Sequence, residues 1–281
     1  MVFKTHKSLT HHLLKYRNNT VGFVPTMGAL HSGHLSLMEY ALNDCDYLVV
    51  SIFVNPTQFD NSSDLDKYPR TVEDDVQLIY NTFGPENCAI YTPSVEDVYQ
   101  DQTKAKSYSY DGLEHVMEGA NRPGHFDGVG TILEFLFNKV QPNYAYFGEK
   151  DFQQLQIVKK LVEKLQLNIE IIGCPIKREP HGLAMSSRNE RLSVEARQYA
   201  AFIHESLLKA KAYFKNNSIT DTIEMVASLY DKQSHLELEY FTITSEETLV
   251  PVKRKYHKHT YRGFIVAHIE GVRLIDNLRL S

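Results

Sequence analysis

Residues 21–35, Val-Gly-Phe-Val-Pro-Thr-Met-Gly-Ala-Leu-His-Ser-Gly-His-Leu, join a strand pattern to a helix pattern through a turn that contains glycine. The apolar run 21–24 predicts a short buried strand, which we expect Pro25 to end because proline cannot donate to a sheet ladder. Gly28 and Gly33 predict a turn in which the backbone approaches another group closely. Apolar residues then recur at helical spacing, so the turn leads to the N-terminus of a helix.

Two histidines lie where this helix begins. The unpaired N–H groups and the positive dipole end of a helix N-terminus form a ready site for an anion. His31 and His34 are three residues apart, which places them on one face of a turn. Two imidazoles at this position suit a nucleotide phosphate that undergoes substitution. The alternative is that both histidines only cap the helix.

The next apolar run extends this pattern to a β-α-β unit. Residues 46–54, Asp-Tyr-Leu-Val-Val-Ser-Ile-Phe-Val, are what a central parallel strand covered on both faces requires. Asn55 and Gln58 follow this strand. Because ligands of open α/β sheets bind beyond the carboxyl ends of the strands, we expect both amides on the same rim as the two histidines. A loop in which Asn55 caps the following turn is an equally good interpretation.

Acidic residues gather at the start of the next expected helix, residues 71–83. Its first turn holds Glu73, Asp74 and Asp75. Acidic side chains favour a helix N-terminus, and this interpretation is sufficient for the pattern. A magnesium site is the alternative, because carboxylates suit that ion.

Two later loops carry basic residues in front of helices. Arg122 and His125 lie in a Gly/Pro loop, where they could meet an anion or cap the helix that follows. Residues 143–147 predict a short strand, and Gly-Glu-Lys-Asp at 148–151 connects it to another helix. Lys150 at such a junction can place a point charge on phosphates, and an exposed lysine at a strand end is the alternative.

The segment after the last expected core strand, 169–176, contains Met-Ser-Ser-Arg at 185–188. Hydroxyls, backbone N–H groups and an arginine in a mobile segment can hold a triphosphate in the transition state. Ser186 as a nucleophile would need a paired base and an oxyanion hole, and the sequence has no Gly-x-Ser-x-Gly elbow. A solvated turn is the remaining alternative.

The C-terminal part of the chain changes character. Residues 193–215 and 219–232 predict two amphipathic helices, while 237–244 and 263–269 alternate like strands of a small antiparallel sheet. We therefore expect a smaller α+β domain at 177–281 that closes as a lid over the nucleotide fold.

Composition restricts the class of function. The chain has 281 residues, 42% of them hydrophobic, which suits one large or two modest packed domains. A net charge of −5 argues against a general nucleic-acid binder. Three cysteines far apart suggest neither disulfides nor zinc and fit a reducing cytoplasm. We see no signal peptide and no bilayer-spanning run, and so expect no membrane partner.

Four motifs occur in the order in which the pantoate–β-alanine ligase (pantothenate synthetase) family carries them. Pro-Thr-Met-Gly-Ala-Leu-His-x-Gly-His at 25–34 resembles the first, and its His-x-Gly-His is similar to the signature of the nucleotidyltransferase superfamily. Asn-Pro-Thr-Gln-Phe at 55–59, Phe-Gly-Glu-Lys-Asp-x-Gln-Gln at 147–154 and Met-Ser-Ser-Arg at 185–188 resemble the others. Arg-Pro-Gly-His-Phe at 122–126 also occurs in the family.

The resemblance implies a fold, a reaction and partners. The fold would be a Rossmann-like parallel-sheet domain at 1–176 with the smaller lid domain at 177–281, and the enzyme would be a cytoplasmic homodimer. The reaction would be ATP-dependent condensation of pantoate with β-alanine through a pantoyl adenylate, with Mg²⁺ accompanying ATP. An adenylyltransferase acting on a phosphate acceptor is the alternative among enzymes, and a nucleotide-binding regulatory protein is the alternative outside them.

The same resemblance implies roles for individual residues. Gln58 and Gln154 would hold pantoate, and a phosphate-acceptor adenylyltransferase would lack this pair. The complete set comprises the catalytic residues His34, Lys150, Ser186 and Arg188, the further ATP-binding residues Met27, His31, Gly148, Asp151, Ile176, Met185 and Ser187, and the substrate-binding amides Asn55, Gln58 and Gln154.

Overall fold

The computed structural model describes residues 1–59, 65–66, 68–100 and 102–281, and the chain divides into two compact units. The first unit comprises Met1–Glu149 and Gln153–Pro175, and the second comprises Lys150–Phe152 and Ile176–Ser281. The domain boundary expected at residue 176 stays a prediction. The short segment Lys150–Phe152 interrupts the first unit in sequence but packs with the second.

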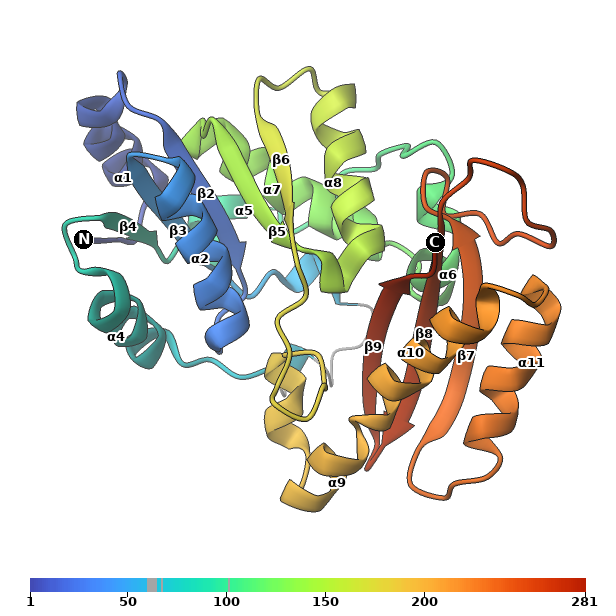
Figure 1. Ribbon diagram of the computed structural model, residues 1–281. Helices are drawn as coiled ribbons and strands as arrows, with labels where there is room; N and C mark the ends of the chain where they lie inside the picture. The colour runs from blue at the N-terminus through green and yellow to red at the C-terminus, as the bar shows by residue number, and fades with distance from the viewer. Residues whose placement is uncertain (60–64, 67, 101) are drawn as a thin grey trace. The chain divides into compact units, whose positions relative to one another are not determined.

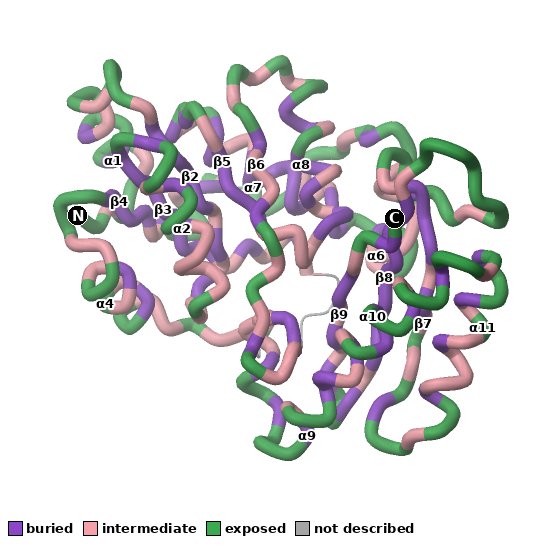
Figure 2. The backbone as a smooth tube through the Cα atoms, viewed as in Figure 1, coloured by how far each residue is buried: buried purple, intermediate pink, exposed green. Residues whose placement is uncertain are grey.

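The first unit is built on a six-stranded parallel sheet with the order β1-β4-β3-β2-β5-β6 (Figure 1). The strands are β1 Val2–Phe3, β2 Val21–Thr26, β3 Tyr47–Ile52, β4 Cys88–Tyr91, β5 Tyr144–Gly148 and β6 Glu170–Cys174. Every residue of β3 is buried, which confirms the central strand predicted from its continuous apolar run (Figure 2).

Pro25 does not end β2, contrary to expectation. The strand continues to Thr26, and Pro25 lies opposite Ser51 of β3. Pairing of β2 with β5 covers Gly22 and Phe23, whereas pairing with β3 continues to the end of β2. At Pro25, β2 therefore pairs with β3 but no longer with β5, and the missing N–H of proline does not interrupt the sheet.

Helices cover both faces of this sheet. The helices at residues 1–175 are α1 His6–Leu13, α2 Ser32–Asp44, α4 Val72–Phe83, α5 Val95–Tyr99, α6 Met117–Asn121, α7 His125–Val140 and α8 Phe152–Lys164. Met38 of α2 and Ile79 of α4 share one core with Val24. Phe23, the neighbour of Val24, faces the other way and meets Phe137 of α7 edge-on, with ring centroids 6.1 Å apart.

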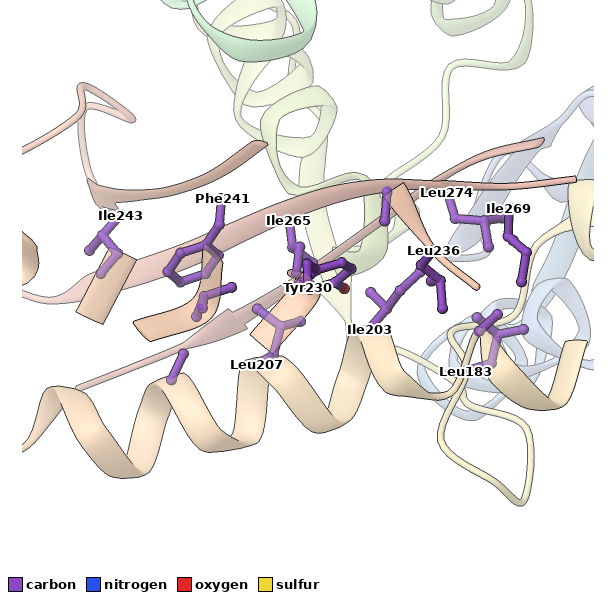
Figure 3. Packing of buried hydrophobic residues seen from close by; sticks show 14 of the residues in the cluster. Leu183, Ile203, Leu207, Tyr230, Leu236, Phe241, Ile243, Ile265, Ile269 and Leu274 are labelled. Atoms are coloured by element: carbon purple, nitrogen blue, oxygen red, sulfur yellow. The ribbon is translucent and has the colours of Figure 1, made fainter. Parts of the chain in front are cut away.

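The second unit combines helices with a three-stranded antiparallel sheet of order β7-β8-β9. Its elements are α9 Val194–Tyr199, α10 Phe202–Phe214, α11 Ile219–Tyr230, β7 Glu237–Ser245, β8 Tyr261–Ile269 and β9 Val272–Arg279. Ile203 and Leu207 of α10 and Tyr230 of α11 belong to one apolar cluster with Ile265 of β8 (Figure 3). Together the two units confirm the predicted fold class.

Two details of this unit differ from the sequence-based expectation. Residues 193–215 form two helices instead of one, because the chain turns at residues 200–201 between α9 and α10. Strand β9 was not expected, although its buried residues Val272, Leu274 and Asp276 alternate with less buried ones. Glu270 and Gly271, both with positive φ, form the turn between β8 and β9, and Gly271 was the signal for this turn in the sequence.

Candidate active site

The first motif forms the turn between β2 and α2. Gly28 (φ +83°) and Ala29 (φ +48°) adopt left-handed backbone conformations, and α2 begins after its N-cap, His31. A Cβ on Gly28 would lie 3.0 Å from Asp75 Oδ2 and 3.2 Å from Ile52 Cγ2. This position therefore requires glycine, for its conformation and for the close approach that the sequence predicted.

The two histidines cap the helix through their Nδ1 atoms. His31 Nδ1 accepts the Gly33 N–H at 3.1 Å, and His34 Nδ1 accepts the His31 N–H at 3.3 Å. A ring nitrogen that accepts a hydrogen bond carries no proton, so each neutral imidazole carries its proton on Nε2. Capping and phosphate binding are thus compatible. The capping hydrogen bonds fix both rings, and each Nε2–H group can donate a hydrogen bond to a phosphate oxygen.

Asp75, in the first turn of α4, anchors the same turn. Its Oδ1 accepts the Leu30 N–H at 2.7 Å, and its Oδ2 accepts the Ala29 N–H at 3.0 Å. Burial raises the pKa of this carboxyl, and the two N–H donors oppose the shift. The sequence predicted that Glu73, Asp74 and Asp75 either favour the helix N-terminus by their charge or bind magnesium. The anchoring contact joins residues 45 apart, so no local pattern could reveal it.

Asn55 and Gln58 lie together beyond the end of β3, and Met27 joins them. Asn55 Nδ2 donates to Gln58 Oε1 at 3.1 Å, and Gln58 Nε2 donates to Met27 Sδ at 2.9 Å. Both amides are buried, with Asn55 fully inaccessible and Gln58 9% exposed. The carboxyl ends of β2 and β3 therefore bring together three residues that were predicted to bind ATP or substrate.

Arg122 and His125 hold the backbone of Gln58. His125 Nδ1 donates to Gln58 O at 2.8 Å, and Arg122 Nη2 donates to the same oxygen at 3.4 Å. Gly128 of α7 lies against this turn, because a Cβ there would be 2.3 Å from Thr57 O. From the sequence, Arg122 and His125 could either bind an anion or cap the helix. The structure shows a further role, because both side chains donate hydrogen bonds to the Gln58 carbonyl.

Lys150 and Asp151 follow β5 in the 3₁₀ turn Glu149–Asp151. Lys150 Nζ lies 3.6 Å from Asp151 Oδ1, and the lysine side chain is 18% exposed. In the glutamine pair that follows, Gln153 is buried and its Nε2 donates to two backbone carbonyls at 2.8 Å. Gln153 is thus a structural residue, whereas Gln154 is only half-buried and remains the candidate for substrate binding.

Hydrogen bonds of Ser186 and of the buried Asn189 hold the Met-Ser-Ser-Arg segment. Ser186 Oγ accepts the Arg188 N–H at 3.3 Å, which makes Ser186 an N-cap. Asn189 is 1% exposed, and its Nδ2 donates to Ala184 O at 3.0 Å and to Glu179 Oε1 at 2.8 Å. The hydrogen bonds of Asn189 to Glu179 and to the Ala184 carbonyl therefore hold both ends of the Met-Ser-Ser-Arg segment in place.

Glu179 in turn pairs with Arg197 of α9. Arg197 Nε lies 3.0 Å and 2.8 Å from the two carboxylate oxygens of Glu179. Burial alone would raise the pKa of Glu179, but the hydrogen bonds from Arg197 and Asn189 outweigh it and hold the pKa below its ordinary value. Glu179 is therefore an anion at neutral pH.

The predicted site residues are divided between the two units. The first unit holds Met27, His31, His34, Asn55, Gln58, Gly148 and Gln154, and the second holds Lys150, Asp151, Ile176, Met185, Ser186, Ser187 and Arg188. Within the described ranges, no three His, Cys, Asp or Glu side chains are grouped so that they could hold a metal ion. The described helices also include none that is long and apolar enough to cross a membrane.

Comparison with known proteins identifies the family. The family model for pantoate-beta-alanine ligase matches residues 1–279. The chain belongs to the pantoate-β-alanine ligase family. The pantothenate synthetase of Flavobacterium psychrophilum is 55% identical over 262 residues, which are 93% of this chain and 92% of that protein. The pantothenate synthetase of Christiangramia forsetii is 48% identical, and the alignment covers 100% of this chain and 99% of that protein.

Solved structures agree with this family assignment. The crystal structure of pantothenate synthetase from Thermus thermophilus matches with a TM-score of 0.91 and 36% identity, covering 100% of this chain and 99% of that one. Pantoate-β-alanine ligase from Francisella tularensis, in complex with β-γ ATP and β-alanine, matches with a TM-score of 0.80 and 32% identity over 100% and 97% of the two chains. These matches confirm the family and the fold that the motifs predicted.

Proposed function

We propose that the chain joins pantoate to β-alanine to form pantothenate, with ATP converted to AMP and pyrophosphate. The observation that carries the proposal is the His31–His34 pair at the start of α2, with both Nδ1 atoms accepting backbone N–H groups, in a member of this ligase family. The Francisella relative was solved with β-γ ATP and β-alanine, which supports both as substrates here. The enzyme is then an ATP-binding ligase of pantothenate biosynthesis.

The first step forms a pantoyl adenylate. A carboxylate oxygen of pantoate attacks the α-phosphorus of ATP, and the bond between that phosphorus and the oxygen bridging to the β-phosphate breaks. Pyrophosphate leaves with the bonding electrons. Negative charge grows on the phosphoryl oxygens and on pyrophosphate, so fixed donors and cations lower the barrier.

Each predicted residue takes a part in this step. Asn55, Gln58 and Gln154 hold pantoate through hydrogen bonds, since amides can bind a hydroxyl or a carboxylate without adding charge. His34, Lys150, Ser186 and Arg188 stabilise the reacting phosphates as catalytic residues. ATP is otherwise bound by Met27, His31, Gly148, Asp151, Ile176, Met185 and Ser187.

The second step joins the amine. The amino group of β-alanine attacks the acyl carbon of the adenylate, AMP leaves with its oxygen, and the nitrogen loses a proton. Both reactants are held by the same protein, so positioning accounts for much of this acceleration.

Mg²⁺ accompanies ATP in this proposal. The described side chains offer no three-residue carboxylate or histidine cluster, which fits an ion carried mainly by the triphosphate and by water. Asp151, whose side chain is 47% exposed, has a carboxylate oxygen 3.6 Å from Lys150 Nζ. When bound, the ion would neutralise phosphate charge. We also propose that the enzyme is cytoplasmic, in keeping with its three free cysteines.

A coupled assay of AMP formation tests the proposed reaction. We expect AMP and pyrophosphate only when ATP and pantoate are both present, and pantothenate only when β-alanine is added. Pyrophosphate release that needs a phosphorylated acceptor in place of pantoate would instead indicate an adenylyltransferase. A purified, folded chain that binds ATP without turnover would indicate a regulatory protein.

A further inference from the structure

The segment Lys150–Phe152 is fastened to the C-terminal sheet. It lies between two parts of the first unit in sequence but belongs to the second unit. Phe152 is 6% exposed, and its ring lies 6.2 Å from that of Phe264 in β8. The guanidinium carbon of Arg262, also in β8, lies 3.7 Å from the centre of the Phe152 ring. Stacking of this kind fixes both groups.

Asn277 of β9 connects this sheet to the backbone of Lys150. Its Nδ2 donates to Lys150 O at 2.9 Å, and its Oδ1 accepts from Arg262 Nη1 at 2.6 Å. Asn277 is 1% exposed; its hydrogen bond with Arg262 is buried, and its hydrogen bond to Lys150 O is partly buried. Most buried side-chain polar atoms in proteins have a hydrogen-bond partner, and both ends of the Asn277 amide have one.

Arg262 decides which way the Asn277 amide points. Its Nε and Nη2 bind Glu246 Oε1 at 2.9 Å and 2.6 Å, which holds the guanidinium in place. An arginine can only donate, so the amide oxygen of Asn277 must face Arg262 and the NH₂ group must face Lys150 O. Glu246, Arg262 and Asn277 thus form an ordered chain of hydrogen bonds that ends on the main chain of Lys150.

We propose that Asn277, oriented by Arg262, is a positioning residue for Lys150 in adenylate formation. Lysine has a long and flexible side chain, so the place of its ammonium group depends on how firmly its backbone is held. A displacement of about 1 Å at a reacting group can lower a rate about 10²-fold. This inference rests on the proposed function, in which Lys150 binds the triphosphate.

A double-mutant cycle with Asn277→Asp and Lys150→Ala tests the inference. Aspartate keeps an oxygen for Arg262 but has no N–H for Lys150 O. We expect Asn277→Asp to lower kcat for pyrophosphate release about tenfold or more, with a smaller change in the KM for pantoate. In the Lys150→Ala background, itself about 10²–10³-fold slower, the same substitution should change the rate less than twofold.

Asn217→Asp is the matched control, because Asn217 Nδ2 also donates to a backbone carbonyl of the second unit, at 2.9 Å from Tyr213 O. It should keep the wild-type rate. An Asn277→Asp rate within twofold of wild type, or a loss that persists in full without Lys150, would overturn the inference. Should Asn277→Asp fail to fold, Arg262→Lys, which keeps the charge and loses the fork, replaces it in the cycle with the same two expectations. Normal pyrophosphate release by Lys150→Ala would instead refute the role of Lys150 in the proposed function, and this inference with it.

Discussion

The carboxylate of Asp75 accepts the N–H groups of Ala29 and Leu30, the two residues that precede His31. Ala29 has positive φ, a conformation that is unfavourable by roughly 1 kcal/mol for a residue with a Cβ. Two hydrogen bonds to one buried carboxylate offset that penalty. The spacing of the histidines and the glycine at position 28 were readable in the sequence, whereas this distant support was not.

Replacing Asp75 with asparagine tests this support. The amide keeps the shape of the side chain but turns one acceptor into an NH₂ group that opposes a backbone N–H. We expect the free energy of unfolding to fall by about 1–3 kcal/mol and the rate of pyrophosphate release to fall about tenfold. Urea unfolding and initial rates measure the two effects.

Glu73→Gln is the control for Asp75→Asn, since it removes the same charge from an exposed position in the same helical turn. Its effect on stability should stay within about 0.5 kcal/mol. Equal losses in the two variants would show that only the acidic character of the turn matters.

At the scale of elements, the strand–turn–helix order of residues 21–44 followed from hydrophobic periodicity and glycine placement. Periodicity could not show that residues 193–215 break into two helices, because the apolar face continues through the turn at 200–201. Chain order placed Lys150–Phe152 with the first domain, while packing of Phe152 against β8 places it with the second unit. Contacts between residues far apart in sequence decide such cases.

The loop that carries Met-Ser-Ser-Arg depends on Glu179. Replacing Glu179 with glutamine removes the buried one of the two carboxylates that contact Arg197 and weakens the hydrogen bond from Asn189. We expect a loss of about 1–3 kcal/mol in the free energy of unfolding at pH 7. Because the folded pKa of Glu179 is lowered, its contribution is present above the ordinary value of 4.5 and is lost as the pH falls through the folded pKa.

The difference in the free energy of unfolding between wild type and Glu179→Gln should therefore narrow as the pH is lowered below the ordinary value of 4.5, which denaturant unfolding at several pH values can follow. Glu190→Gln removes the exposed carboxylate that also contacts Arg197, at 3.2 Å, and should change stability by less than about 1 kcal/mol. A difference that is constant across pH would show that the charge of Glu179 is not what stabilises the loop.

At the scale of the whole molecule, we predict a homodimer, on the ground of the family resemblance alone. Light scattering at assay concentration should give a mass near twice the 32.3 kDa of one chain. A mass near that of one chain, unchanged as the concentration is raised, would contradict the prediction.

The route through a pantoyl adenylate can be read from the fate of a single oxygen atom. Pantoate labelled with ¹⁸O in its carboxylate is converted with ATP and β-alanine, and the products are analysed by mass spectrometry. Attack at the α-phosphorus must transfer one labelled oxygen to AMP, because that oxygen stays on phosphorus when the amine displaces AMP. Attack at the γ-phosphorus would instead carry the label into inorganic phosphate and yield ADP. We predict one ¹⁸O in AMP for each pantothenate formed, and label in phosphate or its absence from AMP would contradict the mechanism.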